Sequence, residues 1–197
     1  LMGSQRSSSL TRLGFGVEAG TAFGLGPTED KEGYRLQEAL CEARASGAIG
    51  DVLLLLQHPP VITVGRDGGE EDILAPASTL QKLGIGVLPT DRGGRATYHG
   101  PGQLVVYPIL RPDNGDYHAY AWRLEETAIR VLDSYGLPAG RINGYPGVWV
   151  GSSNGSGRRD KIAAVGLAVR DGITRHGLAL NVAPEMAHFD LLISCGS

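Results

Sequence analysis

The segment Arg92–Gln103 combines the residue types of a ligand-binding loop. It is rich in glycine, and it carries two arginines, a tyrosine and a histidine but no large aliphatic side chain. Glycine lets the backbone approach a ligand closely or adopt a positive φ, while the other side chains supply charge and hydrogen bonds. An apolar run starts immediately afterwards at Leu104. A glycine-rich loop that leads directly into a core strand predicts a binding site on a rigid scaffold.

Cys195 is a candidate nucleophile, because a thiolate can attack a carbonyl carbon and form a covalent intermediate. Free cysteine is more often a small buried hydrophobe, but Gly196 follows Cys195 and leaves the thiol approachable. The other cysteine, Cys41, lies in a predicted helix beside apolar residues, and we interpret it as inert. The residues alone therefore leave both a buried and a catalytic role open for Cys195.

Lys161 stands between a Gly/Ser-rich loop and a strand of small residues. A solvated lysine at the start of a strand is the common case. The alternative is a cation placed beside a thiol or a ligand carbonyl, where it lowers a thiol pKa from about 8.5 and moves protons.

His99 and His176 both precede a glycine, and each fits either a structural role or a place in the lining of a ligand site. No group of His, Cys, Asp and Glu has metal-ligand spacing, so no metal is expected. The phosphate-binding fingerprints of nucleotide sites are also missing, and no cofactor is predicted.

The composition indicates an ordinary globular chain of 197 residues with a net charge of −3. This charge does not indicate a basic surface for binding nucleic acid or a membrane. No apolar run approaches the ~20 residues of a membrane span. Two distant cysteines and no export signal favour the cytoplasm. We expect a disordered lead-in over residues 1–11 and a single domain over residues 12–197.

Hydrophobic periodicity and turn residues outline the elements that must position these groups. The clearest helix is Glu29–Ala45, which places Tyr34, Leu36, Ala39, Leu40 and Ala43 near one face. Strands are expected at Leu13–Val17, Asp51–Gln57, Val61–Val64, Ile85–Leu88, Leu104–Ile109, Gly147–Val150, Ile162–Val169 and Thr174–Val182, and further helices at Ala75–Leu83 and Tyr117–Tyr135. Adjacent strands with occasional helices favour an α+β fold with a mixed, largely antiparallel sheet and flanking helices.

Four segments together resemble the octanoyltransferase family of lipoate biosynthesis, the octanoyl-[acyl carrier protein]–protein N-octanoyltransferases. They are His58–Arg66, Arg92–Gln103, Lys161–Gly166 and His176–Val182, and the second is the most specific. The resemblance extends from about Glu29 to Gly196. It implies the fold of the catalytic domain of biotin and lipoate protein ligases.

The resemblance also implies a role for each matching residue. Cys195 aligns with the family nucleophile and Lys161 with its partner, in a transferase that forms a thioester acyl-enzyme during protein lipoylation. The substrate-binding positions are Arg92, Gly93, Gly94, Arg95, Ala96, Thr97, Tyr98, His99, Ala164, Val165, Gly166, Gly177, Leu178 and Ala179. The family usually has a proline before the nucleophile, where this chain has Ser194, and continues beyond it, where this sequence ends at Ser197.

The partners implied are octanoyl-acyl carrier protein as donor, and lipoyl domains of 2-oxoacid dehydrogenases and the glycine cleavage H protein as acceptors. Two alternatives remain. One is an ATP-dependent lipoate or biotin-type protein ligase, which activates a free acid and needs no cysteine. The other is a non-catalytic protein that binds acyl carriers or lipoyl domains.

Overall fold

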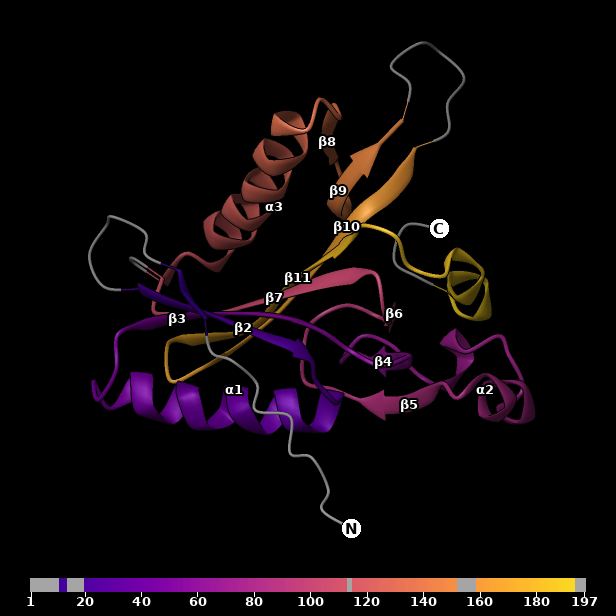
Figure 1. The fold of residues 1–197 in the computed structure, drawn as a ribbon, viewed down its shortest axis with the longest axis horizontal. Helices are drawn as coiled ribbons and strands as arrows, with labels where there is room; N and C mark the ends of the chain where they lie inside the picture. The colour runs from indigo at the N-terminus through magenta and orange to yellow at the C-terminus, as the bar shows by residue number, and fades with distance from the viewer. Residues whose placement is uncertain (1–10, 14–19, 113–114, 152–158, 194–197) are drawn as a thin grey trace.

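The computed structural model describes residues 11–13, 20–112, 115–151 and 159–193 (Figure 1). The helices are α1 (Asp30–Ala45), α2 (Ala77–Leu83) and α3 (Tyr117–Ser134), with 3-10 helices η1 (Glu70–Asp72) and η3 (Met186–Leu191). The strands are β1 (Thr11–Leu13), β2 (Gly20–Pro27), β3 (Asp51–Gln57), β4 (Val61–Val64), β5 (Gly86–Pro89), β6 (Ala96–His99), β7 (Gln103–Ile109), β8 (Ala139–Ile142), β9 (Tyr145–Val150), β10 (Asp160–Arg170) and β11 (Ile173–Asn181).

The described strands form a large sheet and a small one. The large sheet has the order β1-β2-β3-β7-β11-β10-β9-β8, and all its pairs are antiparallel except β2 with β3. The small sheet has the order β5-β4-β6, with β4 parallel to β5 and antiparallel to β6. The predicted α+β class with a mixed, largely antiparallel sheet is therefore confirmed, although the sequence did not indicate that the strands divide into two sheets.

Helix α1 packs along the large sheet through a narrow stripe of residues (Figure 1). Its buried positions are Gly33, Gln37 and Cys41, four residues apart and so on one face. Acidic residues in the first turn and Arg44 in the last suit the helix dipole. The apolar face predicted for this helix was partly wrong, since Ala39 was placed on it but is exposed. The small and polar stripe lets α1 approach the sheet closely and hydrogen-bond to it.

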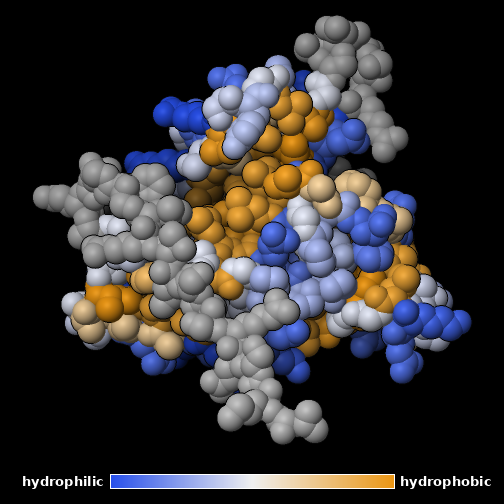
Figure 2. All heavy atoms as spheres, viewed as in Figure 1, coloured by the Kyte–Doolittle hydropathy of each residue, from blue (hydrophilic) through white to orange (hydrophobic). Residues whose placement is uncertain are grey.

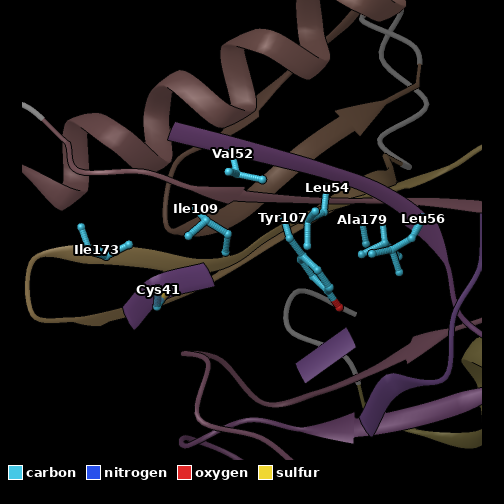
Figure 3. Packing of buried hydrophobic residues seen from close by; sticks show 9 residues of the cluster. Cys41, Val52, Leu54, Leu56, Tyr107, Ile109, Ile173 and Ala179 are labelled. Atoms are coloured by element: carbon cyan, nitrogen blue, oxygen red, sulfur yellow. The ribbon is translucent and has the colours of Figure 1, made fainter. Parts of the chain in front are cut away.

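Three clusters of buried side chains hold these layers together. The first joins α1 to the centre of the large sheet, and Figure 3 shows it running from Cys41 and Ile173 at one end to Leu56 and Ala179 at the other. The second joins the small sheet to α2 and η3 through Tyr98 and Leu192. The third lies between α3 and strands β9 to β11, beside the apolar hollow below α3 in Figure 2.

Several elements differ from the sequence-based expectation. Strands β2 and β8 were not predicted, because β2 is rich in glycine and β8 has no apolar alternation. The segment predicted as a glycine-rich loop contains strand β6, which pairs with β4 over four residues. Most of the strand predicted at 13–17 lies outside the described residues. The structure does not describe residues 1–10 either, so the boundary of the predicted lead-in stays a prediction.

Candidate active site

A cavity of about 790 Å³ opens between the large sheet, the small sheet and η3. Its floor is made by the pocket-facing residues of β7, β11 and β10, and its walls by β6, β9 and η3. Along the floor, Gly166 lies opposite Gly177 and Ala164 opposite Ala179. These small residues leave a groove along the two strands from Asn181 to Gly177, a length of about 13 Å.

Nearly every site residue predicted from the sequence lies at this cavity. The lining includes Arg92, Gly93, Gly94, Arg95, Ala96, Thr97, His99, Lys161, Ala164, Val165, Gly166, Gly177, Leu178 and Ala179. Tyr98 is not part of the lining: it is 1% exposed, and its hydroxyl hydrogen-bonds to His188 in the second cluster. Cys195 lies outside the described residues, so its place stays a prediction.

The two arginines of the glycine-rich segment shape the cavity wall. Arg92 is buried and donates hydrogen bonds to the carbonyl and hydroxyl oxygens of Thr63, at 2.7 and 2.9 Å, and to the carbonyl of Arg95. Arg95 pairs with the fully buried carboxylate of Asp72, and this contact holds the pKa of Asp72 below its usual range. Both guanidinium groups therefore serve to brace the segment, a role that the sequence did not indicate.

Glycine is required where the strands of the floor approach their neighbours. A Cβ on Gly177, whose φ is +153°, would collide with the carbonyl of Val106. A Cβ on Gly166 would lie 3.0 Å from Arg92 Cδ and 3.3 Å from the Gly93 carbonyl. The glycines predicted from the family motifs therefore let β10, β11 and the Arg92 segment pack closely around the groove.

Lys161 enters the cavity at the start of β10. Its Nζ lies 4.7 Å from the centre of the Trp149 ring, a cation–π contact from the neighbouring strand. Gly147, on the same strand as Trp149, also borders the lysine, because a Cβ there would lie 3.4 Å from Lys161 Cδ. Gly147 itself has a φ of +115° and donates its N–H to Glu125 at 2.8 Å. Together these contacts direct the lysine chain into the cavity.

We expect Gly147→Ala to reduce turnover about tenfold or more, because the new methyl lies 2.5 Å from the Ala163 carbonyl and displaces Lys161. Steady-state acyl transfer and a thermal melt check this. The matched control is Gly144→Ala, which has a similar strain at φ +82° but no neighbour within 4 Å. Equal activity losses in the two variants would contradict a specific effect on Lys161.

Neutral histidines and a tyrosine line the polar part of the cavity or lie behind it. His58 bonds to the Thr28 carbonyl through Nδ1 and to the Tyr107 hydroxyl through Nε2, both at 2.7 Å. Nδ1 must donate to a carbonyl, so Nε2 accepts from the tyrosine. Burial lowers the pKa of His58 and lowers that of His99 to about 3, and it raises the pKa of Tyr107. These side chains therefore act as fixed dipoles rather than as charges.

His176 marks a break in the regular geometry of β11. Its φ is +57°, and its backbone N–H donates to the Gln37 side chain on α1 at 2.6 Å. Its Nε2 lies 2.7 Å from Asp91, which also pairs with Arg175. The hydrogen bond from His176 is the main cause that holds the pKa of Asp91 low. The structure thus places this histidine in the cavity lining while tying it to the scaffold.

Cys41 is excluded from the cavity, as predicted. It is 4% exposed, and burial raises the pKa of its thiol to about 11. Its Sγ lies 3.6 Å from the Thr174 carbonyl. In Figure 3 it lies beside Ile173, far from Ala179 in the cavity floor. A thiol held in its protonated form in the core cannot serve as the nucleophile.

Sequence reasoning missed several cavity residues. Trp149 and Asn181 belong to predicted strands but were not singled out, although one is aromatic and the other polar. The residues of η3 were not singled out, and Asp30 was predicted only as part of a helix start. Tertiary packing brings these positions to the cavity, so a local pattern does not reveal them.

The described residues contain no group of three His, Cys, Asp or Glu side chains arranged to hold a metal ion. Among the helices that the structure describes, none is long and apolar enough to cross a bilayer.

The cavity thus contains a groove of small residues with Lys161 at one end, a shape that fits an extended chain. The model of the lipoyl protein ligase A/B catalytic domain matches residues 31–196, and the chain belongs to that family. An octanoyltransferase from Chloroflexus aggregans is 45% identical over 179 residues, which are 89% of this chain and 79% of the relative.

Two solved structures share the fold at low sequence identity. Lipoate-protein ligase A bound with ATP has a TM-score of 0.63 at 19% identity, over 90% of this chain and 72% of that one. A bipartite lipoate protein ligase from Thermoplasma acidophilum, studied with its E2 lipoyl domain, also has a TM-score of 0.63 at 19% identity, over 87% and 65%. The predicted family, fold and acyltransferase class are confirmed.

Proposed function

We propose that this chain transfers an octanoyl group from octanoyl-acyl carrier protein to a lysine of a lipoyl carrier domain, through a thioester on Cys195. The observation that carries the proposal is the groove along β10 and β11, which begins at Lys161 and is lined by small residues. It is longer than an extended eight-carbon chain. Burial contributes about 0.8 kcal/mol per CH₂, so a straight acyl chain gains affinity along this floor.

The segment before Cys195 is anchored at the cavity wall, and this supports the proposed role of Cys195 as the nucleophile. Leu192 is buried in the second cluster and pairs with Ile73, and the N–H of Ile193 donates to the Asp72 carbonyl at 2.7 Å. Asp72 in turn pairs with Arg95, which lines the cavity. The family match also extends through Cys195 to residue 196.

The proposed reaction balances within the Cys195–Lys161 pair. The thiolate attacks the donor thioester, its sulfur–carbon bond forms, and the carrier sulfur leaves with a proton from the Lys161 ammonium. The neutral lysine then takes a proton from the attacking amine of the acceptor, whose nitrogen–carbon bond forms as the Cys195 sulfur leaves. The thiolate and ammonium are restored. A thioester is converted to an amide, so no nucleotide is consumed.

The proposed acceptors are lipoyl domains of 2-oxoacid dehydrogenases and the glycine cleavage H protein. A structural neighbour is a lipoate protein ligase that was analysed together with its E2 lipoyl domain, and the relative at 45% identity is an octanoyltransferase.

The direct test mixes the purified protein with octanoyl-acyl carrier protein and an apo lipoyl domain, without nucleotide, and follows the mass of the domain. We expect one octanoyl group on the domain. Modification only with free octanoate and Mg-ATP, with AMP released, would identify a ligase instead. Saturable binding of either partner with no modification under both conditions would identify a binding protein.

A further inference from the structure

A chain of hydrogen bonds links His99 to the backbone of Lys161 across four strands. His99 Nδ1 lies 2.6 Å from Gln103 Oε1. Gln103 Nε2 lies 2.9 Å from Asn181 Oδ1 and 3.2 Å from the Tyr98 carbonyl. Asn181 Nδ2 lies 3.4 Å from the Lys161 carbonyl. The chain begins on β6 and ends on β10.

This chain of hydrogen bonds sets the tautomer of the His99 ring. Both hydrogens of the Gln103 amide point at oxygen acceptors, so its Oε1 must accept a hydrogen bond. His99 Nδ1 is therefore the donor, and Nε2 carries the lone pair of a neutral ring. The low pKa of His99, which burial lowers to about 3, keeps the ring in this form.

His99 Nε2 is a hydrogen-bond acceptor at the cavity. The residue is 7% exposed and belongs to the cavity lining. Within the described part of the chain, Nε2 makes no hydrogen bond. A neutral imidazole nitrogen that lines a cavity and has no protein donor is suited to accept a hydrogen bond from a ligand.

The position of His99 identifies the part of the substrate that it meets. Gln103 and Asn181 are paired residues of β7 and β11, and Lys161 starts the next strand, β10. Gln103 and Lys161 therefore lie at the same end of the floor, about two strand spacings or roughly 10 Å apart, and His99 adjoins Gln103 from β6. In the proposed function the alkyl chain runs from this end toward Gly166 and Gly177, which puts the reacting carbon at the end of the floor where His99 lies.

We propose that His99 Nε2 accepts a hydrogen bond from the acceptor-lysine amine as this amine attacks the acyl-enzyme, an inference that rests on the proposed function. A neutral primary amine has two N–H bonds and must turn its lone pair to the carbonyl. Lys161 takes the proton of one N–H, and His99 holds the other. The bond that forms is nitrogen–carbon, the bond that breaks is carbon–sulfur, and the proton returns to Lys161. His99 aims the amine and gains no proton.

The test separates the two half-reactions by rapid quenching and intact mass. The His99→Ala variant is charged with octanoyl-acyl carrier protein, and the acyl-enzyme is then mixed with an apo lipoyl domain. We expect charging at the parental rate and discharge slowed about tenfold to a hundredfold. Normal charging also shows that the variant is folded at its active site. His99→Gln can present an amide oxygen near the Nε2 position and should recover part of the discharge rate.

A matched control is His118→Ala, because His118 is exposed on α3 and does not line the cavity. Discharge of His99→Ala at the parental rate would overturn the inference. Equal slowing of charging and discharge would also overturn it, since His99 would then bind the carrier or support the fold. A parent protein that forms no acyl-enzyme would instead overturn the proposed function, and the inference with it.

Discussion

The Cys195→Ser variant is expected to lose octanoyl transfer by roughly 10⁴-fold or more, because a serine hydroxyl is almost entirely protonated at neutral pH and is a far weaker nucleophile than a thiolate. The variant should also fail to accumulate a covalent adduct when it is incubated with octanoyl-acyl carrier protein. Intact mass spectrometry under single-turnover conditions measures the adduct, and transfer to an apo lipoyl domain measures turnover.

The control is Cys41→Ser, since Cys41 is the other cysteine of the chain. Its thiol is buried and hydrogen-bonded to the Thr174 carbonyl, a contact that serine can keep. We expect this variant to form the adduct and to turn over near the parental rate, with a modest loss of stability. Transfer that survives Cys195→Ser but not Cys41→Ser would refute the assignment of the nucleophile.

The Lys161→Met variant should lower turnover by about 10²–10⁴-fold, the usual range for a general acid–base group. Methionine keeps most of the length of the side chain and can pack against the Trp149 ring, but it has no ionisable group and loses the cation–π contact. Without the ammonium, the thiolate fraction of Cys195 falls at neutral pH. Alkylation by iodoacetamide, followed against pH, should therefore slow at pH 7 and shift to higher pH.

Lys82→Met is the matched control. Lys82 is exposed in the last turn of α2 and does not line the cavity. It should keep the parental rate of transfer and the parental alkylation profile. If iodoacetamide alkylates the Lys161→Met variant at pH 7 as fast as it alkylates the parent protein, the lysine does not activate the thiol. A loss of turnover in that case would locate its role in the second half-reaction alone.

Local sequence patterns predicted the main helices and strands, because the residues of each element reflect which of its positions are buried and where it ends. The alternating burial of β3, in which Val52, Leu54 and Leu56 face the core, follows from an apolar run of strand length. The end of α2 follows from Gly84, which adopts a φ of +67°. Strand β2 gave no such signal, because its glycines and small residues are stabilised by pairing with β3 rather than by propensity.

The sequence by itself determined the family, the α+β class and the segments that surround the groove, because those segments contain the small residues that close strand packing demands. Tertiary structure alone decided what each polar group does. Arg92 reaches Thr63, 29 positions away, and Gln103 reaches Asn181, 78 positions away. Through these contacts Arg92 stabilises the cavity wall, and Gln103 fixes the tautomer of His99. A hydrogen bond depends on where its partner lies in space, and strand order sets that place for residues distant along the chain.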